Sequence, residues 1–248
     1  MRPGGCVRRS LSPRPHGVSS RRVKEKPNVW LPVALMLVFA LTRWPGLLPL
    51  NFSAAYALVF CAGVYLPRPL AWWLPLGTMV VSDIALNLYY HFGLGIDAFK
   101  PTQLVNYFVF AGIIWLGTKF APRQKARGIA GELKSFTKLL SGGIMGALIF
   151  YLVTNTAAWF FNPFNNPEYT KDFAGWLITL TKGTAGYAQT WEFFRNTLLS
   201  GGLFTGLFVG AMKLTEATES AREKETPETE KEPEAEPAGD AKPEEAKA

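Results

Sequence analysis

The chain has 248 residues, of which 48% are hydrophobic and 14% aromatic, and its formal net charge is +7. The charge is uneven: residues 214–248 hold 12 Asp and Glu against 5 Lys and Arg, whereas the first 213 residues hold 7 acidic and 21 basic side chains. Soluble domains have about one charged residue in four, so a 213-residue stretch with so few charges argues against a purely water-soluble domain.

The two ends of the chain are polar. Residues 1–28 hold eight Lys and Arg among Pro, Ser and Gly, and residues 214–248 are mostly Glu, Pro, Ala, Lys and Thr. Such segments bury too little apolar surface to fold, so we expect a disordered basic tail and a disordered acidic tail. Cys6 lies in the first tail and Cys61 in an apolar segment, so no disulfide is expected.

Between the tails lies a predicted transmembrane domain, residues 29–213. A helix needs about 20 apolar residues to cross a bilayer. The first segment is the weakest, because Arg43 interrupts it; a signal peptide is the alternative, but no small-x-small cleavage site follows. The six predicted membrane helices are about 29–48, 52–66, 70–91, 101–120, 138–161 and 191–213.

The basic residues predict the orientation of these helices. Six Lys and Arg lie between residues 119 and 138, and Arg68 follows the second segment. The two loops on the opposite side hold only Lys100, Lys171 and Lys182. Because cytoplasmic loops are enriched in Lys and Arg, we expect a multi-pass protein of a bacterial inner membrane with both termini in the cytoplasm. The basic residues form no face interleaved with aromatic side chains, so no nucleic-acid partner is expected.

Polar side chains interrupt four predicted helices at one depth, in their outer halves. In the third, the run TMVVSDIALNLYYH (78–91) places Asp83 and Asn87 one turn apart. A carboxylate inside a bilayer needs a partner, water or a function. We therefore expect an outward-facing cavity for a small-molecule substrate. Its candidate residues are Asp83, Asn87, Tyr90, Asn106, Asn155, Trp159, Trp191, Glu192, Arg195 and Asn196.

Arg195 is the expected partner of Asp83, because a guanidinium keeps its charge and would hold the carboxylate ionised. The alternative is an internal network of polar contacts that binds nothing. With only His16 and His91 in the sequence, no metal site or cofactor is expected. Gly-x-Ser-x-Gly, His-Glu-x-x-His and paired-carboxylate motifs are missing, so no catalytic residue is proposed and an intramembrane enzyme is a less favoured function.

Two further features concern packing. The outer loop 162–190 contains an apolar stretch at 173–181, which predicts a short surface helix that either covers the cavity as a lid or packs at the membrane surface. Small residues recur at spacing four, which lets helices approach closely, either within the chain or against another membrane subunit. These packing or docking residues are Ser53, Ala57, Cys61, Gly142, Gly146, Gly202, Gly206 and Gly210, and the last three are expected to pack most tightly.

Parts of the sequence resemble known transport proteins. The run NFSAAYALVFCAGVYLPRPL (51–70), followed by GTMVVSDIAL (77–86), is similar to the second and third helices of S components, the substrate-binding membrane subunits of energy-coupling factor (ECF) transporters. Those helices often combine small residues, a short turn with Gly or Pro and an Asp, here Asp83. The span 29–213 also resembles an uncharacterised bacterial family of proposed transport proteins, through its Asn-Phe-Ser and Ser-Asp elements and WEFFRNTL (191–198).

The resemblance implies six helices and capture of a small, vitamin-like solute from the outer side. S components depend on a separate transmembrane coupling subunit with ATPases, in agreement with the missing Walker A loop here. The first helix departs from the family, because Ala34 and Ala40 lack the Ala-x-x-x-Ala spacing of its docking motif. The sequence thus predicts an all-α integral membrane protein that acts as a substrate-capturing transport subunit; a non-transport scaffold or assembly protein is the alternative.

Overall fold

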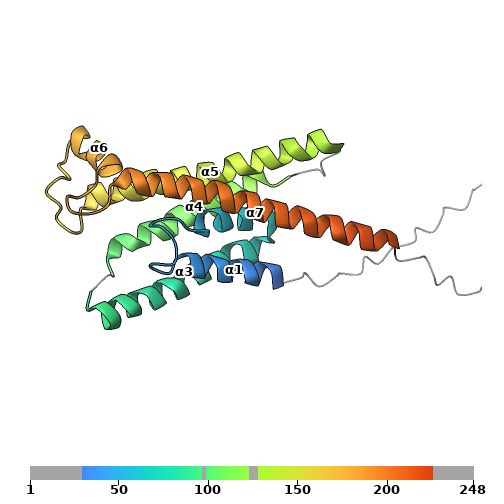
Figure 1. Cartoon of the computed structure of the whole chain (residues 1–248), viewed down its shortest axis with the longest axis horizontal. Coiled ribbons are helices and arrows are strands. Elements are labelled where there is room, and N and C mark those ends of the chain that lie inside the picture. The colour runs from blue at the N-terminus through green and yellow to red at the C-terminus, as the bar shows by residue number, and fades with distance from the viewer. Residues whose placement is uncertain (1–29, 97–98, 123–127, 226–248) are drawn as a thin grey trace, which may run out of the picture.

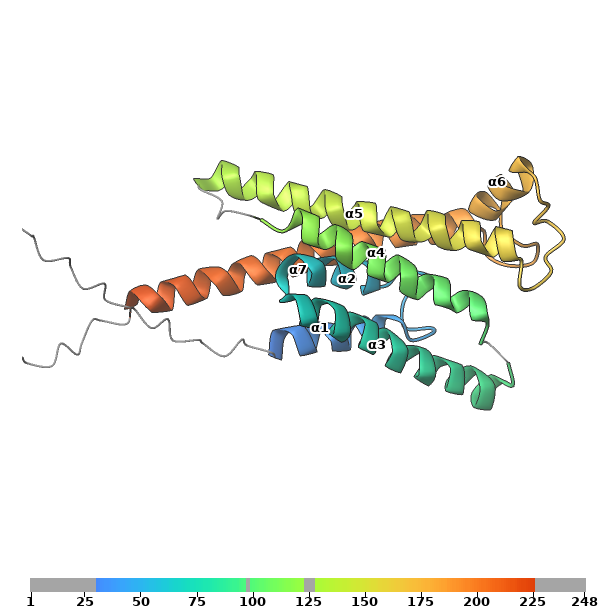
Figure 2. The same ribbon diagram turned by 180° about the vertical axis from the view of Figure 1, so that it is seen from behind.

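The computed structural model describes residues 30–96, 99–122 and 128–225. The predicted basic tail, most of the acidic tail and several basic residues of the 121–137 loop therefore lie outside the described residues. Within the described part the backbone consists of helices and loops, without a β-strand. The long helices run roughly along the long axis of the molecule, and a short helix lies at one end of the bundle (Figures 1 and 2).

The helices differ strongly in length. A π-helical turn, Tyr89–Gly93, continues the third helix, and a 3-10 turn, Pro101–Gln103, precedes the fourth. The α-helices are α1 (Trp30–Thr42), α2 (Ala55–Tyr65), α3 (Arg68–Leu88), α4 (Leu104–Phe120), α5 (Gly128–Phe161), α6 (Phe173–Thr181) and α7 (Thr190–Glu225).

Three helical stretches among the described residues are long and apolar enough to cross a membrane. They are Arg68–Gly93, Gly128–Phe161 and Thr190–Thr218. Helix α4 has 17 residues, which rise about 26 Å, a little less than the ~30 Å hydrocarbon core. The chain therefore has the character of an all-helical membrane protein.

Helix α7 is longer than predicted. It continues through residues 214–225, for which a disordered tail was expected. Half of this stretch consists of Glu and Ala, which are strong helix formers, and the first proline after Lys213 is Pro227. Residues 214–225 are helical because a stretch without an apolar face can still continue a helix that packing has already started.

The first two helices are shorter than predicted. Helices α1 and α2 have 13 and 11 residues, which rise only about 20 and 17 Å. Helix α1 ends at Thr42 because Pro45 disfavours helical backbone before it and Gly46 has a φ of +80°. Figure 1 shows α1 starting and α2 ending on the side toward which α7 runs. The connecting loop, 43–54, begins at Arg43, whose side chain contacts Ser82 and Asp83 in the second half of α3. Much of the loop is exposed, including Leu47 and Leu50.

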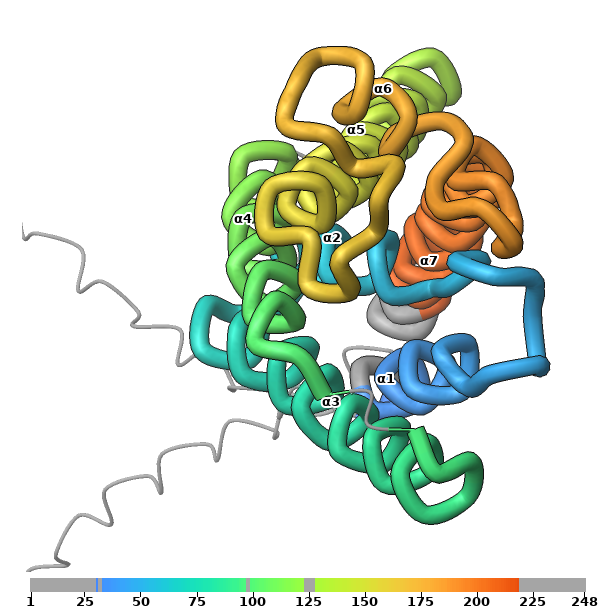
Figure 3. The backbone as a smooth tube through the Cα atoms, turned by 90° about the vertical axis from the view of Figure 1, so that its left-hand side faces the viewer, coloured from blue at the N-terminus to red at the C-terminus, as the bar shows by residue number. Residues whose placement is uncertain are grey.

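Helix α2 lies at the centre of the bundle, as the view along the long axis shows (Figure 3). Its residues 55–64 are all buried, and it contacts α1, α3, α4, α5 and α7. A helix that is apolar on every side suits such a position. The small residues Ser53, Ala57 and Cys61 belong to this buried centre, so they pack within the chain.

Helices α2 and α4 approach each other closely enough for their backbones to touch. A Cβ atom at Gly63 would lie 2.1 Å from the carbonyl oxygen of Ile114, and one at Gly117 would lie 2.3 Å from the carbonyl oxygen of Phe60. The two backbones are in direct contact, which only glycine permits. Gly63 and Gly117 therefore set the distance between the central helix and its neighbour.

The predicted glycine face of α7 is open. A Cβ atom at Gly202 or Gly206 would meet nothing closer than 3.6 Å, and one at Gly210 would meet nothing within 4 Å. The expected tight packing within the chain is wrong at these positions, because α7 turns Gly201 toward α5 instead, where a Cβ would lie 2.6 Å from Ala147. A role for the open face in docking another subunit stays a prediction.

The predicted glycines of α5 do pack closely. A Cβ atom at Gly142 would lie 2.4 Å from the Phe60 ring, and one at Gly146 would lie 3.1 Å from the Ile113 side chain. These glycines let α5 approach the centre of the bundle.

Candidate ligand-binding site

The loop 43–54 is held in one shape by hydrogen bonds at its base. The Thr42 hydroxyl accepts a hydrogen bond from the Ala54 amide (3.0 Å), and the Ser53 hydroxyl accepts one from the Ala55 amide (3.1 Å). These bonds satisfy amides at the start of α2 that have no partner within the helix. Non-helical backbone at membrane depth is tolerated where it is buried in protein or lines a cavity. Ser53 and Ala54 of this loop are buried, and most of its other residues line a cavity.

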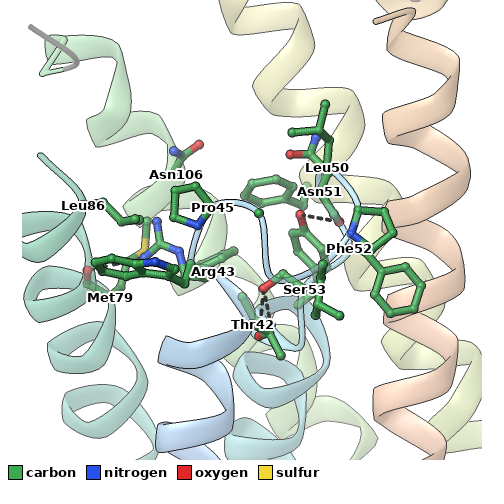
Figure 4. A pocket seen from close by; sticks show the side chains of 18 of the residues that line it. Thr42, Arg43, Pro45, Leu50, Asn51, Phe52, Ser53, Met79, Leu86 and Asn106 are labelled. Atoms are coloured by element: carbon green, nitrogen blue, oxygen red, sulfur yellow. Dashed lines mark hydrogen bonds between the residues drawn. The ribbon is translucent and has the colours of Figure 1, made fainter. Parts of the chain in front are cut away.

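A cavity of about 340 Å³ lies against this loop, between α1 and α2 on one side and α3, α4 and α5 on the other. In Figure 4, Arg43 and Asn106 lie on one side of it, and Leu50, Asn51 and Phe52 lie on the other. Its volume falls within the range of small-molecule sites. Its other lining residues include Tyr56, Tyr90, Phe110 and Phe150, so the wall is both polar and aromatic.

An ion pair joins Arg43, just after α1, to Asp83 in the middle of α3. The two side chains are only 18% and 14% exposed. The Arg43 guanidinium also donates to the Ser82 hydroxyl (2.5 Å), and the Tyr107 hydroxyl of α4 donates to the second Asp83 carboxylate oxygen (2.8 Å). This network ties together α1, α3 and α4 and engages both oxygens of the carboxylate.

The partner of Asp83 is therefore Arg43 and not Arg195, which corrects the sequence prediction. The Arg195 guanidinium lies 5.3 Å from the centre of the Trp191 ring, and the Arg195 residue is exposed. The buried face of α7 carries Asn196 instead, whose side-chain amide donates to the Leu50 carbonyl of the loop (2.9 Å). The early end of α1 brings residue 43 to the depth of Asp83, a change that the apolar pattern alone does not reveal.

A smaller cavity of about 100 Å³ adjoins the first one. Arg43, Leu86, Tyr90 and Asn106 line both, and the smaller one adds Asp83, Asn87 and Gln103. The structure thus brings together four of the predicted site residues, which are Asp83, Asn87, Tyr90 and Asn106. It adds Arg43, Gln103 and Tyr107, which sequence reasoning left out of the site.

Six predicted site residues line neither cavity: Asn155, Trp159, Trp191, Glu192, Arg195 and Asn196. The Asn155 amide donates to the Tyr151 carbonyl one turn earlier (2.8 Å), and the Trp159 indole donates to the Thr170 carbonyl (2.6 Å). All six lie toward the ends of α5 and α7 that adjoin α6.

The loop 162–190 is tied to the end of α5 and to the connection before α4. The Lys171 ammonium donates to the Trp159 and Phe160 carbonyls (2.5 and 2.6 Å). Asp172 begins α6 by accepting a hydrogen bond from the Gly175 amide, and this bond lowers the pKa of the Asp172 carboxyl. The Lys100 ammonium lies 5.6 Å from the centre of the Phe164 ring. The predicted surface helix at 173–181 is present, and its role as a lid stays a prediction.

These features define a class: an all-helical, membrane-type bundle with a polar and aromatic cavity next to an internal ion pair. The chain belongs to a family described as a family of unknown function (DUF6580), which matches residues 23–224. No curated protein and no solved structure matches the chain.

Proposed function

We propose that the chain is a substrate-capturing subunit of a membrane transport system, similar to an S component of ECF transporters. The observation that carries this proposal is the 340 Å³ cavity beside the Arg43–Asp83 pair. A scaffold has no need of such a cavity, whereas a binding protein does.

The chemistry of the wall supports an uncharged ligand. Arg43 and Asp83 neutralise each other, so the wall offers hydrogen-bonding groups rather than net charge. The Asn106 side chain supplies both donors and an acceptor. Tyr56, Tyr90 and Phe110 offer aromatic faces to a flat or apolar part of the ligand. We infer a small, vitamin-like molecule with both polar and apolar parts, and its uptake draws energy from a separate coupling subunit with ATPases.

The proposal includes a topology. Helices α1–α5 and α7 lie in a bacterial inner membrane with both termini in the cytoplasm, and the loop 162–190 faces outward. Helices α1 and α2 enter and leave on the same side. The sidedness of the termini is therefore the same whether this pair crosses the bilayer fully or turns back inside it.

Cysteine labelling of intact cells tests the topology. In a chain with Cys6 and Cys61 replaced, a cysteine at position 168 or 172 is expected to react with a membrane-impermeant maleimide, because it lies in the outer loop. A cysteine at position 128 is expected to react only after the cells are opened. Reaction of position 128 in intact cells contradicts the orientation.

Thermal unfolding tests ligand binding. Purified protein is heated with a panel of vitamins, nucleobases and their amphipathic derivatives, and a ligand at about 100 times its Kd is expected to stabilise the fold by about 2.7 kcal/mol. Asn106→Leu, which fills the cavity wall, is expected to abolish this rise in Tm. Asn155→Leu is the matched control, because Asn155 lies outside the cavity, and it is expected to keep the rise. If no compound raises Tm, the scaffold function is favoured.

A further inference from the structure

A groove of about 660 Å³ lies on the outside of the bundle, between α3 and the start of α4. Its walls are apolar and include Val80, Ile84, Leu88, Phe92 and Leu104. Ile84 is 55% exposed and Leu104 is 56% exposed. Exposed apolar side chains on a helix of membrane-spanning length face lipid, so this groove opens toward the acyl chains rather than toward water.

The bottom of the groove is polar. Asp83, Asn87 and Gln103 line both the groove and the 100 Å³ cavity behind it, and Tyr107 lines the groove where it donates to Asp83. The small cavity in turn shares four lining residues with the main one. Groove, small cavity and main cavity therefore adjoin one another in a row. Asp83, which accepts the hydrogen bond from Tyr107, belongs to the wall that the first two share.

We propose that this groove is a lateral entrance through which the ligand of the cavity arrives from the lipid. The inference rests on the proposed function and narrows its substrate class to an amphipathic molecule with a small polar head and an apolar tail. The polar head exchanges bonds with Tyr107, Asn87 and Gln103 as it passes inward. The apolar tail stays in the groove, which its apolar walls match.

The chemistry favours this occupant over a purely polar solute. A molecule with only polar groups pays a large desolvation penalty in hydrocarbon and does not reach the groove. An amphiphile is already concentrated in the bilayer, and the groove offers it polar partners only at the point where the cavity begins. Arg43 holds Asp83 from behind, so the carboxylate remains in place when the Tyr107 bond opens.

Two thiol reagents test the route in the full chain, reconstituted in phosphatidylcholine vesicles with Cys6→Ser and Cys61→Ala. A single cysteine replaces Leu86, which lines both cavities but not the groove. One reagent is a long-chain N-alkyl maleimide that dissolves in the bilayer, and the other is a charged, water-soluble methanethiosulfonate. Ile84→Trp fills the groove, and Val81→Trp is the matched control, because Val81 is a lipid-facing residue of the same helix, 68% exposed and outside the groove.

The expected result is that the alkyl maleimide reacts with Cys at position 86 and that Ile84→Trp slows this reaction about tenfold or more, equivalent to a barrier increase of about 1.4 kcal/mol. Val81→Trp is expected to leave the rate unchanged, and neither variant is expected to change the rate of the water-soluble reagent. Tyr107→Phe, which removes the hydrogen bond and keeps the ring, is expected to speed the alkyl reaction. An alkyl rate that is insensitive to Ile84→Trp, or an equal loss for both reagents, overturns the lateral route.

The outcome is separable from the test of the proposed function. If a compound raises Tm in the thermal assay while Ile84→Trp leaves the rate of the alkyl maleimide reaction unchanged, ligand binding is supported and the lateral route is contradicted. If the alkyl route behaves as expected but no compound binds, the groove is an entrance for lipid and the transport function falls.

Discussion

Arg43→Ala is expected to lower the free energy of unfolding by roughly 3–5 kcal/mol, the usual cost of removing one partner of a buried ion pair. The substitution removes the charge that faces Asp83 and the bond to Ser82. Among the described side chains it leaves Tyr107 as the donor to the Asp83 carboxylate. It also releases the end of α1 from α3, so the loop that lines the cavity loses its support. Thermal or denaturant unfolding of the purified protein in detergent measures this effect.

Arg195→Ala is the matched control. It removes the same functional group from an exposed position where the guanidinium rests on the Trp191 ring, an interaction worth about 0.5–1 kcal/mol. A loss from Arg195→Ala as large as that from Arg43→Ala would contradict the assignment of the partner.

The double variant Arg43→Met with Asp83→Leu separates charge from packing, because replacing both members of a buried pair by apolar residues is often neutral or stabilising. The double variant is therefore expected to recover stability while losing ligand binding.

The sequence predicts the longer helices well because their apolar runs exceed the length that lipid requires. The stretches at 70–91, 138–161 and 191–213 all fall within helices long enough to cross a membrane. The prediction of one long helix for the first segment was wrong for a local reason. An apolar run of 20 residues can be one helix or a short helix followed by an apolar loop, and only Pro45 and Gly46 distinguish the two. Their backbone preferences end α1 at Thr42, six residues before the predicted end at residue 48.

The early end of α1 also explains why Arg43 was not predicted as a site residue. The sequence correctly singled out Asp83 as a carboxylate that needs a partner, and it found Asn87, Tyr90 and Asn106 near it. Arg43 was treated as an interruption of a weak helix. An arginine in an apolar segment, however, needs a partner, water or a function just as the aspartate does. Two opposite charges inside apolar segments of one chain are the signal that could have found the pair. The rotation of α5 and α7 about their own axes decides which of their polar residues face the cavity. This rotation could not be predicted in the same way, because both helices carry polar groups on more than one face.

The second large effect is expected from Gly63→Leu. Because a single Cβ at this position would lie 2.1 Å from the Ile114 carbonyl oxygen, the backbones of α2 and α4 must separate before any side chain fits. Overpacking of a core typically costs 1–3 kcal/mol, and here the obstruction is backbone, which cannot move aside as a side chain can. We expect a loss of about 3 kcal/mol or more, or a protein that does not fold. Even Gly63→Ala is expected to lower Tm.

Gly206→Leu is the control for this effect, since it places the same side chain on the open face of α7, where a Cβ would lie 3.8 Å from its nearest neighbour. Within the isolated chain it is expected to change the free energy of unfolding by less than about 1 kcal/mol, because the higher helix propensity of leucine offsets any crowding. The sequence pattern alone ranks the two substitutions the other way, because Gly206 belongs to a regular glycine face and Gly63 does not. Comparable melting temperatures for both variants would contradict the contact between α2 and α4. A Gly206→Leu variant that folds normally but no longer retains a membrane partner would instead support the docking role of the α7 face.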